Sequence, residues 1–121
     1  MQTSKALSAG ILGAAMMTLI MALLRALAVP INLELLLGTM ILREVSAGAW
    51  IAGFFVHLGA GAVFAMVYAA LFELGSQRAG WDVGFGISVL HAIFAGAVLL
   101  AVPVVHPLIP LGIRAPGAFM A

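Results

Sequence analysis

Charge is scarce in this sequence, and cysteine is missing altogether. Of the 121 residues, 7% are charged and 65% are hydrophobic, and the Cys count is 0. Soluble globular domains have about 25% charged and roughly 45–50% apolar residues, so these few polar side chains cannot cover a surface that faces water. Without Cys, the sequence excludes disulfides, thiolate metal sites and thiol catalysis. The shortage of charge, together with the excess of hydrophobic residues, indicates an integral membrane protein whose solvent is the lipid bilayer.

Groups that bind nucleic acid or catalyse reactions are also missing. The basic residues are scattered singly, as Lys5, Arg25, Arg43, Arg78 and Arg114. A nucleic-acid-binding surface needs clustered Lys and Arg, so we exclude DNA and RNA as partners. The sequence contains no carboxylate pair, no nucleophile with its base, no phosphate-binding loop and no metal-spaced cluster. We therefore predict that the protein is not an enzyme.

Three apolar runs are long enough to cross the hydrocarbon core of a bilayer, which takes about 20 helical residues. They cover residues 6–29, 47–74 and 81–102. A signal peptide is the alternative for the first run, because Ala26-Leu27-Ala28 resembles a cleavage site. The run is longer than the core of an ordinary signal peptide, and Arg25 interrupts the approach to that site, so we favour a membrane span. Three crossings place the two chain ends on opposite sides of the membrane.

The segment between the first two spans is predicted to lie at the membrane surface. Residues 31–44 follow Pro30, which ends the first helix, and Asn32 is placed to cap a short new helix. The segment is too short and too interrupted to span, so an interfacial or re-entrant helix is expected. The residues expected to turn toward the membrane are Leu33, Leu36, Leu37 and Met40.

The last part of the sequence is rich in proline. Residues 103–121 contain Pro103, Pro107, Pro110 and Pro116. Proline lacks the amide hydrogen that a helix needs, so the third span is expected to end at Pro103 and an extended tail to follow. His106 is then expected to be a surface residue. The predicted fold class is an all-α membrane protein with a single domain over residues 1–121.

Each predicted span carries a stripe of small residues spaced four positions apart. The residues that we assign to helix packing are Gly10, Ala14, Gly53, Gly61, Gly84, Ser88 and Gly96. In lipid, helices associate through close packing at small residues and not through the hydrophobic effect. Gly and Ala are also common in membrane helices in general, which is the competing explanation. Three stripes in three spans favour tight helix contacts, within the chain or with other transmembrane subunits.

Two histidines, His57 and His91, fall inside predicted spans, where ionisable residues are rare and often functional. If Trp50, Tyr68 and Trp81 mark the membrane interfaces, both imidazoles lie near the midplane at similar depth. Counting from the loop between the spans instead places His91 about 10 Å shallower. One hypothesis is a haem b held between the two histidines, or a metal or proton site. We favour neutral imidazoles without a cofactor, each hydrogen-bonded to a hydroxyl or carbonyl group of a neighbouring helix.

Several short motifs resemble a group of small bacterial four-helix integral membrane proteins without a settled activity. These motifs are Leu37-Gly38 after the first helix, His57 followed by Phe64 and Tyr68, Gly84-Phe85-Gly86, Pro103, and Pro116-Gly117-Ala118-Phe119. The resemblance covers most of the sequence and implies an all-α protein of the bacterial inner (cytoplasmic) membrane. It also implies a fourth helix after the last motif, which this sequence does not contain.

These observations predict an accessory or assembly subunit of a larger membrane complex, respiratory or photosynthetic. The sequence offers packing surfaces without catalytic groups, and three helices cannot enclose much of a transport pathway. One alternative is a haem b electron-transfer subunit that uses His57 and His91. Another is a small oligomeric transporter or channel, in which only Thr18, Ser88 and the two histidines would supply polar groups to a pathway.

Overall fold

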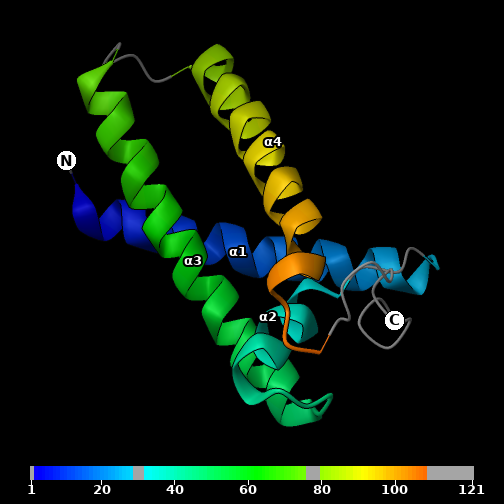
Figure 1. Ribbon diagram of the computed structural model, residues 1–121. Helices are drawn as coiled ribbons and strands as arrows, with labels where there is room; N and C mark the ends of the chain where they lie inside the picture. Colours follow the sequence, from blue (N-terminus) through cyan, green and yellow to red (C-terminus); the bar gives the residue numbers. More distant parts are fainter. Residues whose placement is uncertain (1, 29–31, 76–79, 109–121) are drawn as a thin grey trace.

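The computed structural model describes residues 2–28, 32–75 and 80–108 (Figure 1). Within these ranges the chain forms four helices, α1 (Thr3–Ala26), α2 (Leu33–Leu42), α3 (Ala47–Leu74) and α4 (Trp81–Val105). Three of them, α1, α3 and the Trp81–Val102 part of α4, are long and apolar enough to cross a membrane. The prediction of an all-α protein with three such helices is confirmed. Residues 109–121, most of the predicted tail, lie outside the described residues.

The ends of α2 and α3 are set by local capping residues. Asn32 precedes α2, and its side chain accepts a hydrogen bond from the Leu35 N–H at 3.1 Å, which confirms the predicted cap. The helix ends where Arg43 adopts the left-handed conformation, with φ of 55°. Ser46 then caps α3 by accepting from the Ala49 N–H at 3.1 Å. As a result α2 is a separate helix that folds back onto α3 and does not extend either neighbour.

The central element of the fold is α3 (Figure 1). Helix α1 crosses the middle of α3 steeply, α2 packs on the first turns of α3, and α4 returns beside α3 in the opposite direction. Toward its end, drawn in orange, α4 diverges from α3 and reaches α2. All of α2, the start of α3 and the end of α4 therefore gather in one region of the molecule.

Backbones touch where α2 packs on α3. A Cβ atom added at Gly53 would lie 1.6 Å from the Glu34 carbonyl oxygen, and one added at Gly38 would lie 1.6 Å from the Ala49 carbonyl oxygen. Neither position has room for a side chain, because carbon and oxygen atoms in ordinary contact are at least 3.4 Å apart. Glycine is thus required on both helices at this contact.

Two polar residues of α2 are fully buried. Glu34 and Thr39 are both 0% exposed. Of the four residues expected to face the membrane, Leu36 is buried, Leu33 and Leu37 are half-buried, and Met40 is exposed. The four residues therefore do not share one environment, because α3 packs on the side of α2 that carries Gly38 and leaves other sides open.

Small residues also form the contact between α1 and α3. A Cβ atom added at Gly10 would lie 2.3 Å from the Gly61 carbonyl oxygen and 2.7 Å from Cβ of Ala65. One added at Gly61 would lie 2.7 Å from Cβ of Ala14. Residues later in α1 thus contact residues earlier in α3, so the two helices run in opposite directions here. The stripes of α1 and α3 pack against each other.

The small-residue stripe of α4 is not used in this way. A Cβ atom added at Gly84 or Gly96 would meet nothing within 4 Å, and Ser88 is exposed. The half-buried residues of α4 that recur every four positions are Val83, Ile87, His91 and Ala95. Successive helical residues are about 100° apart, so this second stripe lies on the side next to the first. Contact of Gly84, Ser88 and Gly96 with other helices stays a prediction.

The end of α4 differs from the sequence-based expectation. The helix continues past Pro103 to Val105, because a proline inside a helix removes one hydrogen bond and bends the axis without always ending the helix. Figure 1 shows the last turns of α4, in orange, turned away from the rest of the helix. This turn brings His106 against α2, where it is 4% exposed. The prediction that His106 is a surface residue is wrong.

Candidate functional site: a buried polar junction

An ion pair joins the end of α1 to the start of α2. Arg25 Nη1 lies 3.5 Å from Glu34 Oε2, and the two side chains are 19% and 0% exposed. A carboxylate without water is costly by several kcal/mol unless an opposite charge compensates it, and Arg25 supplies that charge. The other carboxylate oxygen, Glu34 Oε1, is buried without a hydrogen-bond partner among the described residues. The pair thus balances the charge but leaves one acceptor unsatisfied.

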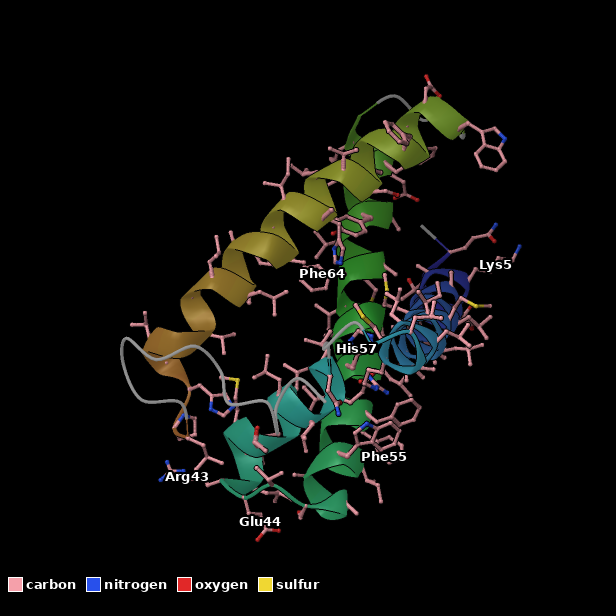
Figure 2. All side chains as sticks on the ribbon, turned by 90° about the vertical axis from the view of Figure 1, so that its right-hand side faces the viewer. Lys5, Arg43, Glu44, Phe55, His57 and Phe64 are labelled. Atoms are coloured by element: carbon pink, nitrogen blue, oxygen red, sulfur yellow. The ribbon has the colours of Figure 1, made fainter. Side chains whose placement is uncertain are left out.

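Two more buried polar atoms, Thr18 Oγ1 and His57 Nε2, lack a hydrogen-bond partner within the described parts of the chain. Thr18 lies one turn after Ala14 on α1, and His57 lies one turn before Gly61 on α3. Ala14 and Gly61 are in contact, and the helices run in opposite directions there, so Thr18 and His57 lie on adjoining turns. Figure 2 shows His57 at the level where α1, seen nearly end-on in blue, crosses α3.

Glu34 approaches the same region from α2. Its backbone carbonyl oxygen abuts Gly53, and His57 is one turn beyond Gly53 on the same side of α3. Thr18, Glu34 and His57 are therefore carried by adjoining turns of three helices, and Arg25 is joined to Glu34 by the ion pair. We refer to these four residues, Thr18, Arg25, Glu34 and His57, as the polar junction.

His91 lies in a different region, between α3 and α4. Its Nδ1 is hydrogen-bonded to the Tyr68 hydroxyl, and its ring meets the Phe64 ring edge-on with centroids 5.1 Å apart. A hydroxyl or carbonyl partner on a neighbouring helix was predicted for each histidine, and the Tyr68 hydroxyl confirms it for His91. No such partner of His57 Nε2 is present among the described residues.

His57 of α3 and His91 of α4 lie at different levels of the helix pair. His91 is level with Tyr68, which is eleven residues beyond His57, or about 16 Å along the helix. Figure 2 likewise shows Phe64, the ring that contacts His91, well above His57. The prediction of similar depth is wrong, because Tyr68, which was interpreted as marking a membrane interface, bonds to His91 and lies level with it. A haem with two axial histidines needs both on one iron, and the fold does not bring them together.

His106 fastens the end of α4 to α2. Its Nε2 lies 3.0 Å from Thr39 Oγ1 and 3.2 Å from the Leu36 carbonyl oxygen, while Nδ1 accepts from the Leu108 N–H at 3.2 Å. The Thr39 hydroxyl itself donates to the Leu35 carbonyl oxygen at 2.8 Å. With Nδ1 accepting, this network assigns a neutral imidazole whose Nε2–H donates toward Thr39 and Leu36. Both nitrogens of this buried ring are used.

The sequence offered one signal for the polar junction that our prediction did not use. Glu34 is a single carboxylate inside the apolar run Leu33–Leu42, and it was assigned to a surface helix. A lone ionisable residue in an apolar membrane segment usually faces the protein interior and pairs there, which the ion pair with Arg25 bears out. Within residues 2–28, 32–75 and 80–108, no three His, Asp or Glu side chains are placed to hold a metal ion.

Comparisons with protein families, with curated proteins and with solved structures find no match to this chain. The resemblance to small bacterial four-helix membrane proteins therefore stays a prediction.

Proposed function

We propose that the protein is an accessory or assembly subunit of a larger membrane complex, and that α4 contacts the neighbouring subunit. The observation that supports this is the uncovered stripe of Gly84, Ser88 and Gly96. Equivalent stripes on α1 and α3 pack tightly against each other at Gly10 and Gly61. Helix α4 thus carries the kind of surface that this fold uses for helix packing, and the described part of the chain leaves it open.

The shape of this side of α4 supports the same proposal. A hollow on its surface is lined by Gly80, Trp81, Gly84, Phe85 and Ser88. Trp81 and Phe85 are 96% and 72% exposed, so two large rings flank the small residues. A hollow between large side chains accepts a ridge of side chains from another helix, which is the usual geometry of helix packing. A transmembrane helix of a partner subunit is the matching shape.

We propose in addition that α2 does not cross the membrane. Its ten residues span about 15 Å, half of the hydrocarbon core. The glycine contact ties α2 to the first turns of α3, and the Thr39–His106 contact ties it to the end of α4. Both contacts are compatible with an interfacial or re-entrant helix on the side of the membrane where α3 begins. The bacterial inner membrane is proposed from the sequence resemblance.

Site-directed crosslinking in native membranes tests the role of α4. Because the sequence has no Cys, single-cysteine variants can carry a thiol-attached photocrosslinker without competing labels. We expect Ser88→Cys to give one adduct of defined mass with a second protein. The matched control is Leu90→Cys, 59% exposed in the wild type and about 200° around the helix from Ser88, which should label only lipid.

Other outcomes of the crosslinking experiment contradict the proposal. Equal labelling at both positions, or no protein adduct from either, means that lipid covers the stripe. An adduct between two copies of this chain supports the small oligomeric transporter or channel instead. The accessory role stands only if the stripe captures a different polypeptide.

A further inference from the structure

The polar junction contains three buried polar atoms that the described chain leaves without hydrogen bonds. They are Thr18 Oγ1, Glu34 Oε1 and His57 Nε2. Each such group costs about 1–3 kcal/mol when it is left unsatisfied, and native proteins contain few of them. Three such atoms on adjoining turns of three different helices are the basis for inferring a bound species that supplies the missing hydrogen bonds.

The chemistry of the three atoms defines what can bind. Glu34 Oε1 only accepts hydrogen bonds, the Thr18 hydroxyl both donates and accepts, and His57 Nε2 does either according to its tautomer. The bound species must therefore be able to donate and accept at the same time. A water molecule does so, and buried waters typically make about three hydrogen bonds to polar groups that would otherwise be unsatisfied.

The charge of the junction argues against an ion. Arg25 already compensates the carboxylate of Glu34 at 3.5 Å, so the pair is neutral as a whole. A bound cation would leave a net positive charge away from water, and a bound anion would face Glu34 at close range. The ionisable groups that α1 and α2 bring here are the Arg25–Glu34 pair itself, and α3 adds only His57 from its adjoining turns. A neutral ligand fits this balance.

We propose that the polar junction is a binding site for an internal water molecule that bridges Thr18, Glu34 and His57. On α3, Gly61 contacts α1 and Gly53 contacts α2. The water lies between these two contacts, next to His57. It links the three helices through hydrogen bonds at the place where their backbones begin to separate. The site is independent of the stripe on α4 and of any partner subunit.

Water-edited solid-state NMR on the full chain in lipid bilayers tests the proposal. Magnetisation that starts on water should reach the His57 ring rapidly, whereas the Phe64 ring, about two turns further along α3, should receive little. Thr18→Val removes one hydrogen-bonding group at nearly constant volume and should lower transfer to His57 by about threefold or more. Ser8→Ala, which removes an exposed hydroxyl from the same helix as Thr18, should leave that transfer unchanged.

Three results would overturn the water site. The first is no transfer from water to the His57 ring in the wild type, and the second is equal transfer to the His57 and Phe64 rings. The third is a change of the His57 signals when sodium chloride replaces choline chloride, because that means that a cation occupies the junction. If Thr18→Val fails to fold, Glu34→Gln keeps the side-chain shape while changing one acceptor into a donor. It should then shift the His57 ring signals without exposing the ring to bulk water.

Discussion

A methyl group at Gly53 should separate α2 from α3. The Cβ atom of alanine would lie 1.6 Å from the Glu34 carbonyl oxygen and 2.6 Å from the Gly38 nitrogen. Both are backbone atoms, so no side chain can rotate out of the way. Relief of the first contact requires the helices to move apart by about 1.8 Å, which also breaks the van der Waals contacts around it. We expect Gly53→Ala to destabilise the protein by about 3 kcal/mol, the upper end for overpacking.

Gly59→Ala is the matched control for this substitution. It lies on the same helix, and a Cβ atom there would meet nothing within 4 Å. Both variants gain the same intrinsic helix propensity, about 1 kcal/mol at most, so their difference isolates the contact with α2. Unfolding in mixed micelles with increasing dodecyl sulfate, followed by circular dichroism, measures the free energy of unfolding of each variant. Gly59→Ala should match the wild type or exceed it slightly.

Equal unfolding free energies for Gly53→Ala and Gly59→Ala would refute this reasoning. They would mean that α2 does not pack on α3 through backbone contact. A loss in Gly59→Ala as large as in Gly53→Ala would point to lipid contact or helix distortion as the common cause. Only a loss confined to position 53 agrees with the fold.

Three further predictions concern the polar contacts. Arg25→Leu leaves Glu34 buried without its counter-charge and should lower the free energy of unfolding by about 3–5 kcal/mol. The double variant Arg25→Leu with Glu34→Leu should recover most of that loss when both are unfolded with dodecyl sulfate. His106→Phe removes the hydrogen bonds to Thr39 and Leu36, so spin labels at Ile41 and Val104 should show a broader distance distribution by electron spin resonance. Leu100→Ala, at a position 83% exposed on the same helix as Val104, should not broaden it. The purified protein should lack a reduced-minus-oxidised difference band of b-type haem, because His91 is level with Tyr68, about 16 Å beyond His57 along α3. A band that disappears in His57→Ala and His91→Ala would contradict that geometry.

The sequence was sufficient to predict those features that depend on neighbouring residues in the chain. Apolar length predicted the three long helices, and Asn32 predicted where α2 begins. The four-residue spacing of small residues placed Gly10 and Gly61 on helix-facing sides, because this spacing matches the turn of a helix. It did not say which stripe would find a partner inside the chain.

Features that depend on distant residues could not be predicted in this way. His106 is buried because it meets Thr39, 67 positions earlier, and nothing near either residue signals that contact. The depth of His91 depended on whether Tyr68 faces the interface or bonds to a neighbouring helix, and the sequence favoured the wrong choice. The burial of Glu34 was missed because this residue was interpreted with its sequence neighbours and not with Arg25 across the turn.

The central claim is that the open stripe of α4 holds a different membrane protein, and native mass spectrometry of the complex from mild detergent tests it most directly. We expect the 12.5 kDa chain to be recovered with a second polypeptide at fixed stoichiometry. Gly96→Leu should abolish this association while the isolated chain keeps the unfolding free energy of the wild type, because that position is open in the fold. Recovery of the wild type as a single chain, or unchanged association of Gly96→Leu, would contradict the account.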